Sequence, residues 1–165
     1  MREVISNTSP LQYLFQAERL DLLPVLYGTV VVPSGVADEL AEGRARGLAL
    51  PDPKTLPWVR VRVMADTALL RIVADLDRGE REVLALAKQA ADPLAILDDG
   101  LARRYARLLG IPFTGTLGVL LKAKANGHLA QVSPVLDRLD ALHFRIDAET
   151  RLQVLRLANE SPGAR

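Results

Sequence analysis

Cysteine is absent from the 165-residue sequence. Its absence excludes disulfide frameworks, thiolate zinc sites and cysteine nucleophiles, and it fits a reducing compartment. Long apolar runs are absent too, because no stretch approaches the roughly 20 residues of a membrane span. The first residues do not form a charged and then apolar signal segment. We therefore expect a cytoplasmic protein without a membrane segment.

A strong charge of either sign is also lacking. Lysine and arginine total 21 and aspartate and glutamate total 20, which gives a formal net charge of +1. This balance excludes a protein that coats nucleic acid through bulk charge, but it allows a local basic face beside a local acidic pocket. With 49% hydrophobic and 25% charged residues, the composition is that of a globular protein. We expect a single domain over residues 1–160 and a frayed tail at 161–165.

Short apolar segments alternate along the chain with segments of helical periodicity. The apolar segments predict strands at 4–6, 29–32, 58–63, 94–97 and 111–113. The periodic segments predict helices starting at Ser9-Pro10 and at 20–26, 34–42, 66–76, 79–90, 100–109, 116–125, 134–142 and 148–157. This alternation predicts an α/β fold with a mostly parallel sheet that helices cover on both faces. In such sheets, functional groups collect beyond the carboxyl ends of the strands.

Acidic and amide side chains stand near those strand ends. Asn7 follows the first predicted strand, Glu39 lies in the helix after the second, and Glu80 begins the helix before the fourth. Asp98 and Asp99 follow the fourth strand. Several carboxylates from different elements, without histidine or cysteine, suit a hard cation such as Mg²⁺ or Mn²⁺. Such a site supports phosphodiester hydrolysis.

Structural roles for the same acids stay open at this point. Asp98 or Asp99 can cap the helix that starts at Gly100, and the helix dipole can favour Glu80 at a helix start. On a helical wheel Glu80 falls at the centre of the apolar stripe, so it needs a cation, hydrogen bonds or a raised pKa. Glu82 falls on the polar face, and we expect it to point to solvent.

Basic side chains gather on the helix after Asp99. We expect Leu101, Tyr105 and Leu108 to face inward, and Arg103, Arg104 and Arg107 to face outward as RNA-binding residues. The alternative is an ordinary solvated helix face. For the remaining candidates we expect loop surface at His128, packing beside Phe144 at His143, and strand packing at Trp58.

Four motifs in this order resemble those of PIN-like proteins related to VapC-type toxins. They are the opening SNTSPL at 6–11, GEREVLALA at 79–87, ILDDGLAR at 96–103 and TGTLGVL at 114–120. The C-terminal stretch with Leu136, Leu139 and Phe144-Arg145-Ile146 also resembles one prokaryotic branch of these proteins. The resemblance covers nearly the whole chain.

The resemblance implies a three-layer α/β/α fold with extra C-terminal helices and a ribonuclease that depends on Mg²⁺ or Mn²⁺. It implies cleavage of cellular RNA, a small antitoxin partner and a homodimer. Carried over by position, the catalytic set is Asn7, Glu39, Glu80 and Asp99. The metal ligands are Asn7, Glu80, Asp98 and Asp99, with Ser9 and Thr116 in support.

One position differs from the family pattern, in which the first residue of the active site is usually aspartate. Here it is Asn7, whose amide oxygen can ligate a hard cation but brings no charge. Two functions are therefore open. The first is a metal-dependent endoribonuclease, the toxin of a toxin–antitoxin pair. The alternative is a catalytically weakened PIN-like module that binds RNA or a protein partner.

Overall fold

A parallel sheet forms the centre of the molecule. The computed structural model describes residues 1–65 and 68–162. Within them lies a five-stranded sheet, in the order β3-β2-β1-β4-β5, in which every neighbouring pair is parallel. The strands are β1 (Glu3–Ser6), β2 (Val30–Pro33), β3 (Val59–Arg62), β4 (Pro93–Ile96) and β5 (Phe113–Thr114). The predicted parallel α/β fold is confirmed.

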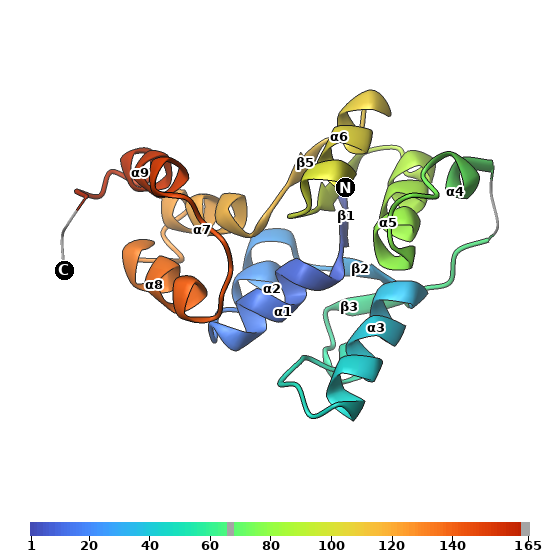
Figure 1. Ribbon diagram of the computed structural model, residues 1–165, viewed down its shortest axis with the longest axis horizontal. Helices are drawn as coiled ribbons and strands as arrows, with labels where there is room; N and C mark the ends of the chain where they lie inside the picture. The colour runs from blue at the N-terminus through green and yellow to red at the C-terminus, as the bar shows by residue number, and fades with distance from the viewer. Residues whose placement is uncertain (66–67, 163–165) are drawn as a thin grey trace.

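Helices cover both faces of this sheet, so the fold has three layers. The helices are α1 (Thr8–Gln16), α2 (Leu22–Tyr27), α3 (Ser34–Ala45), α4 (Ala68–Ile72), α5 (Arg78–Gln89), α6 (Gly100–Leu108), α7 (Thr116–Ala125), α8 (Ser133–Ala141) and α9 (Ala148–Leu157), with a 3₁₀ turn at Pro53–Thr55. The chain moves outward in opposite directions from β1 to β2 and from β4 to β5. Right-handed crossovers therefore place α1 and α2 on one face and α6 on the other. Figure 1 shows α4 and α5 on one side of β1 and α1, α2 and α7 on the other.

The two central strands meet at the sheet edge that the sequence pointed to. Ser6 at the end of β1 pairs with Ile96 at the end of β4. The N–H of Asn7 donates to the carbonyl of Ile96 at 3.1 Å, so the pairing continues one residue beyond the strand. Buried Val4, Ile5 and Leu94 hold these strands in the core. Residues that follow β1 and β4 therefore emerge side by side.

The helices α8 and α9 extend the molecule away from the sheet and pack beside α7 (Figure 1). Their apolar faces join the main core through Leu136, Leu139 and Leu155. The Glu160 carboxylate, after α9, accepts a hydrogen bond from the Lys124 ammonium at 2.9 Å. It also accepts hydrogen bonds from the backbone N–H groups of Val132 and Ser133 at 2.7 and 3.0 Å. The C-terminal helices are thus fastened to α7 and to the start of α8.

Most predicted elements are present, many with shifted ends, and three of the helices differ from expectation. The first helix begins at Thr8 with Asn7 at its N-cap position, not at Ser9. The helix predicted over 66–76 ends at Ile72, and its residues 66–67 lie outside the described part of the chain. On α6, Leu101 and Leu108 are 37% and 77% exposed, while the small Ala102 and Ala106 form the buried face. Of the predicted frayed tail, residues 163–165 also lie outside the described residues.

Glu82 does not point to solvent as predicted. Its carboxylate is buried, accepts the N–H of Gly35 at 2.6 Å and pairs with Arg78 at 3.3 Å. A Cβ on Gly35 would lie 2.3 Å from the Glu82 carboxylate, so this approach requires glycine. The helical wheel failed because α5 is packed on more than one side, against the sheet and against α3.

We expect Glu82→Ala to lower the free energy of unfolding by about 1–3 kcal/mol, because it leaves the Gly35 N–H buried without an acceptor. Glu82→Gln keeps an acceptor oxygen and should lose less. Urea denaturation of both variants measures the difference. Identical midpoints for Glu82→Ala and the parent chain would contradict this structural role.

Candidate functional site

Asn7 presents a buried oxygen without a hydrogen-bond partner. The residue is 4% exposed, and its Oδ1 accepts no hydrogen bond from any described residue. An unpaired buried amide oxygen is costly, so its persistence in a folded protein calls for an explanation. A bound cation is one, because an amide oxygen is a good ligand for hard metal ions.

Glu39 lies next to this oxygen, across the start of α5. Its carboxylate accepts the hydroxyl of Thr8 and, at 3.1 Å, the N–H of Gly79. A Cβ built on Gly79 would lie 2.9 and 3.0 Å from the two Glu39 oxygens and 3.1 Å from Asn7 Oδ1. Burial raises the pKa of Glu39, and the charge of Asp77 raises it further, against the hydrogen bonds from Thr8 and Gly79. The side-chain oxygens of Glu39 and Asn7 thus lie close together beside Gly79.

Glu80 stands in the field of several other carboxylates. It lies in the first turn of α5, where the Asp77 side chain caps the helix by accepting the Glu80 N–H at 2.8 Å. Burial raises the pKa of Glu80 to about 7, helped by the charges of Asp77, Asp99 and Glu39. Acids from α3, α5 and the start of α6 therefore repel one another at one place.

Asp98 and Asp99 have different surroundings although they are adjacent. Asp98 accepts hydrogen bonds from Ser9 Oγ at 3.2 Å and from the N–H and hydroxyl of Thr116, both at 2.7 Å. Asp99 is exposed and caps α6, accepting the Ala102 N–H at 3.0 Å. The capping alternative thus applies to Asp99, and it leaves one carboxylate oxygen without a hydrogen bond from any described residue.

Several of these side chains line a cavity of about 410 Å³, which we call the acidic pocket. Its lining residues are Asn7, Ser9, Tyr13, Glu80, Asp98 and Asp99, together with His143, Phe144 and Arg145 from the segment after α8. Glu39 and Thr116 do not line the pocket, but Thr116 donates to Asp98, and Glu39 accepts the N–H of Gly79, the residue before Glu80. The candidate residues from α1, α5 and the turn after β4 are therefore brought together.

The sequence alone did not indicate that the segment after α8 lines the acidic pocket. His143 was expected to pack, but it is exposed, adopts a left-handed backbone with φ +64° and borders the acidic pocket. Asn7 and His143 are far apart along the chain, and no periodicity or motif links them. They come together because α8 and the segment after it pack against α1, through Arg138 with the Ala17 carbonyl and Phe144 with Tyr13. His128 is exposed, as expected.

The three arginines of α6 do not line the acidic pocket, although Arg103 Nη2 and Asp98 Oδ1 both lie close to Gly115. Arg103 donates to the carbonyl of Leu97 at 2.7 Å and lies 5.4 Å from the centre of the Phe113 ring, and Arg107 lies 5.1 Å from the same ring. Arg104 is exposed. Among the described residues that line the acidic pocket, none belongs to this set. Arg103 is engaged in holding β4, β5 and α6 together.

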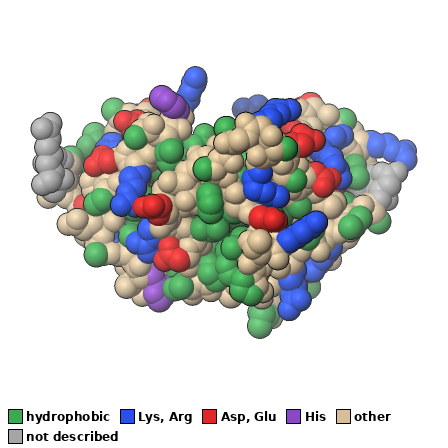
Figure 2. Space-filling model, turned by 90° about the horizontal axis from the view of Figure 1, so that it is seen from below, with side chains coloured by type: hydrophobic (Ala, Val, Ile, Leu, Met, Phe, Trp, Pro, Cys, Tyr) green, Lys and Arg blue, Asp and Glu red, His purple; other side chains and the backbone are tan. Residues whose placement is uncertain are grey.

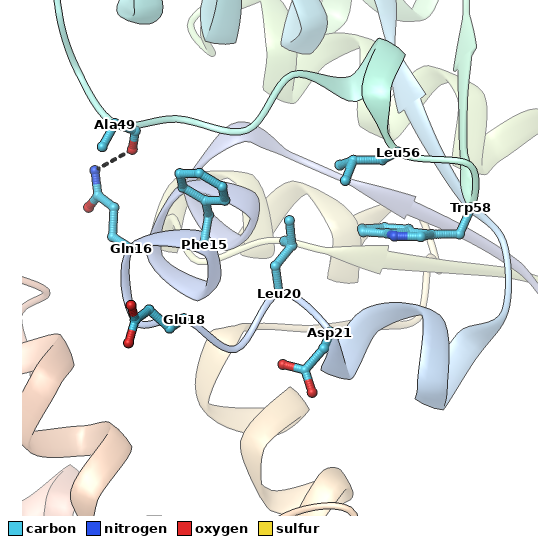
Figure 3. A pocket seen from close by; sticks show the side chains of 8 residues that line it. All are labelled: Phe15, Gln16, Glu18, Leu20, Asp21, Ala49, Leu56 and Trp58. Atoms are coloured by element: carbon cyan, nitrogen blue, oxygen red, sulfur yellow. Dashed lines mark hydrogen bonds between the residues drawn. The ribbon is translucent and has the colours of Figure 1, made fainter.

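A second cavity, of about 600 Å³, carries no comparable chemistry. Figure 3 shows Phe15, Leu20, Leu56 and Trp58 around it, and the Gln16 amide donating to the Ala49 carbonyl at 3.1 Å. Trp58 also packs against the core, as expected, although it lies just before β3 and not within it. The two acids at its rim, Glu18 and Asp21, each have a nearby arginine. This hollow is a mainly apolar surface feature.

A divalent metal ion fits the donors of the acidic pocket. Within residues 1–65 and 68–162, no three acidic or histidine side chains form a complete ligand cluster. Mg²⁺, however, commonly uses one or two carboxylates and keeps several waters. The unpaired Asn7 oxygen, the all-oxygen donor set and the mutual repulsion around Glu80 each match such an ion. No described helix is both long enough and apolar enough to cross a membrane.

Comparison with known families agrees with this fold. A family model described as a PIN domain matches residues 3–160, so the chain belongs to the PIN domain family. PIN domains are typically nucleases and generally use divalent metal ions. Neither a curated protein nor a solved structure gave a significant match.

Gly79→Ala tests the convergence over the start of α5. Alanine is a better helix former than glycine by about 1 kcal/mol, so the helix itself should not suffer. Its methyl group would press on the Glu39 oxygens and Asn7 Oδ1. We expect Mg²⁺ affinity to fall about tenfold, a change typical of disturbed metal-ligand surroundings, with little loss of melting temperature. Calorimetric titration with Mg²⁺ measures it, and unchanged affinity would contradict a metal role for this cluster.

Proposed function

We propose that the chain is a metal-dependent endoribonuclease that hydrolyses RNA phosphodiester bonds, acting as the toxin of a toxin–antitoxin pair. The observation that carries this proposal is the unpaired oxygen of Asn7, buried in a pocket that also holds Glu80, Asp98 and Asp99. A structural acid cluster would satisfy its own polar atoms. A ligand site leaves some of them for the ligand.

The residues in and around the acidic pocket have two proposed roles: some bind the metal ion, and others orient the side chains that bind it. Asn7, Glu80, Asp98 and Asp99 are the proposed metal ligands, for Mg²⁺ or Mn²⁺. When bound, the ion polarises water and the phosphate and offsets charge on the leaving oxygen. Ser9 and Thr116 fix the Asp98 carboxylate through their hydroxyls, and the Thr116 N–H at the start of α7 adds a third hydrogen bond. Glu39 completes the catalytic set beside Asn7.

The net charge of the chain, +1, is too small to attract RNA by itself. On the face shown in Figure 2, basic and acidic side chains are interspersed, and they form no single basic surface there. Local cations at the rim of the acidic pocket must therefore offset its repulsion of phosphate. Of the α6 set, Arg104 and Arg107 are the exposed members that an RNA strand can reach.

The test is cleavage of single-stranded RNA with Mg²⁺ and with Mn²⁺, beside Asp99→Asn and a chelator control. Metal-dependent cleavage that Asp99→Asn removes supports the proposal. RNA binding without cleavage in either metal would favour the alternative, a weakened PIN-like module. The toxin role is tested separately, by growth arrest on expression and its relief by a small protein encoded next to the gene. Light scattering tests the proposed homodimer.

Asn7→Asp separates the two alternatives further. The added carboxylate strengthens a hard-cation site but adds repulsion to the metal-free pocket. We expect faster cleavage, tighter Mg²⁺ binding, a lower melting temperature without metal and a higher one with it. Melting curves with and without Mg²⁺ measure this divergence. Parallel shifts in both conditions would contradict a metal role for position 7.

A further inference from the structure

The acidic pocket is also lined by the connector between α8 and α9, residues 142–147. This α8–α9 connector contributes His143, Phe144 and Arg145 to the same pocket as the acids. Resting on the proposed nuclease function, we propose that Arg145, with His143 beside it, binds a backbone phosphate of single-stranded RNA and so positions the strand over the acidic pocket. The C-terminal helices would then be part of the substrate site.

The α8–α9 connector is held in a defined conformation. The N–H groups of His143 and Phe144 donate to the carbonyls of Asp140 and Leu139 at 3.0 and 2.9 Å. The left-handed backbone of His143, unusual for a residue other than glycine, reverses the chain after α8. At its other end Asp147 caps α9, accepting the N–H and hydroxyl of Thr150 at 2.7 and 3.0 Å.

An aromatic contact joins the connector to α1, which also lines the acidic pocket. The rings of Phe144 and Tyr13 meet edge to face, with centres 4.9 Å apart and planes at 77°. Tyr13 lies on α1, the helix that begins directly after Asn7 and that carries Ser9. The position of the connector is thus tied to the same helix that orients two pocket residues, and it can hold a strand at a fixed offset from the acids.

The charge of Arg145 is available for a ligand. Among the described residues Arg145 forms no ion pair within 4.0 Å, and its side chain is exposed at the rim. Arg103, in contrast, is committed to the Leu97 carbonyl and the Phe113 ring. A guanidinium is well shaped for phosphate, because it can donate two parallel hydrogen bonds. RNA that approaches an acidic pocket needs such a cation at the point of closest approach.

The experiment measures RNA affinity apart from catalysis. A labelled single-stranded RNA is titrated with the full chain over a salt series, once in chelator and once with Ca²⁺ in place of Mg²⁺. Arg145→Gln should weaken binding about five- to tenfold and flatten the slope of log affinity against log salt by about 0.7, the value for one lost phosphate contact on a single strand. Arg145→Lys should recover most of both, because the charge is kept.

Two further variants make the result specific. Arg156→Gln removes an exposed charge from α9 that does not line the acidic pocket, and it should change neither affinity nor slope. Phe144→Ala keeps every charge but frees the connector, and it should weaken binding with the slope reduced. If Arg145→Gln and Arg156→Gln behave alike, the inference is overturned.

The same data separate this inference from the proposed function. Cleavage by the parent chain together with an insensitive Arg145→Gln overturns only the role of the connector. RNA binding that depends on Arg145 in a chain that never cleaves overturns only the nuclease. A Gln variant of Arg103, Arg104 and Arg107 shows whether α6 forms a second part of the track. If it alone flattens the slope, the strand follows α6 and the connector proposal fails.

Discussion

Asp99→Asn is expected to lower the rate of RNA cleavage by about 100-fold or more and to leave the protein nearly as stable as the parent chain. Asparagine caps a helix as well as aspartate does, so the hydrogen bond from the Ala102 N–H at 3.0 Å should survive. What disappears is one of the charges that a divalent ion would neutralise. The two measurements are the cleavage rate at saturating Mg²⁺ and the midpoint of urea denaturation.

The neighbouring residue supplies the matched control. Asp98→Ala removes the acceptor of three hydrogen bonds and leaves the buried Thr116 hydroxyl and N–H unsatisfied. We expect a loss of about 2–4 kcal/mol in the free energy of unfolding, in addition to the loss of cleavage. We assign Asp99 a role in cleavage alone and Asp98 a role in both cleavage and stability. This assignment is wrong if Asp99→Asn destabilises the protein as much as Asp98→Ala does, or if Asp99→Asn cleaves RNA at the parent rate.

The parallel sheet and most helices could be predicted because each has a local cause in the sequence. The runs at 29–32 and 94–97 are short, apolar and bounded by turn residues, and β2 and β4 lie within one residue of them. The helices α7 and α9 have the predicted bounds. Asn7 and Asp98 were expected near each other because they follow parallel strands, and both line the acidic pocket.

The failures share a different cause, which is packing that no local pattern encodes. Glu82 looked solvated because a wheel assumes one buried side, whereas α3 covers the side of α5 on which it lies. On α6 the leucines were expected inside, but close packing against α5 admits only Ala102 and Ala106. The approach of His143 and Arg145 to the acidic pocket depends on how two C-terminal helices fold back, which is set by long-range contacts.

The ionisation of Glu80 should make the free energy of unfolding depend strongly on pH. Burial, with the charges of Asp77, Asp99 and Glu39, raises the pKa of Glu80 from 4.5 to about 7 in the metal-free protein. Between these two values the folded chain holds a proton that the unfolded chain releases. The free energy of unfolding should therefore fall as pH rises from about 4.5 to 7, and stay at the lower level above that.

A bound divalent ion should reverse this trend. The ion needs the ionised carboxylate, so at pH 8 it meets a site with no proton to displace, whereas at pH 5 it competes with one. In chelator we expect a loss of about 1–2 kcal/mol between pH 5 and 8, after allowance for solvent screening of the open pocket. With Mg²⁺ the stabilisation by the ion should grow over the same range.

Glu80→Gln is the control for this titration. Glutamine has nearly the same shape and cannot ionise, so the variant should be more stable than the parent chain at pH 8 without metal, and its stability should depend less on pH. It should also gain less from Mg²⁺, because a charged ligand is gone. Thermal melts of both chains at four pH values, with chelator and with Mg²⁺, provide the comparison. Equal pH dependence in the two chains would place the titrating group elsewhere, and equal gains from Mg²⁺ would remove Glu80 from the metal site.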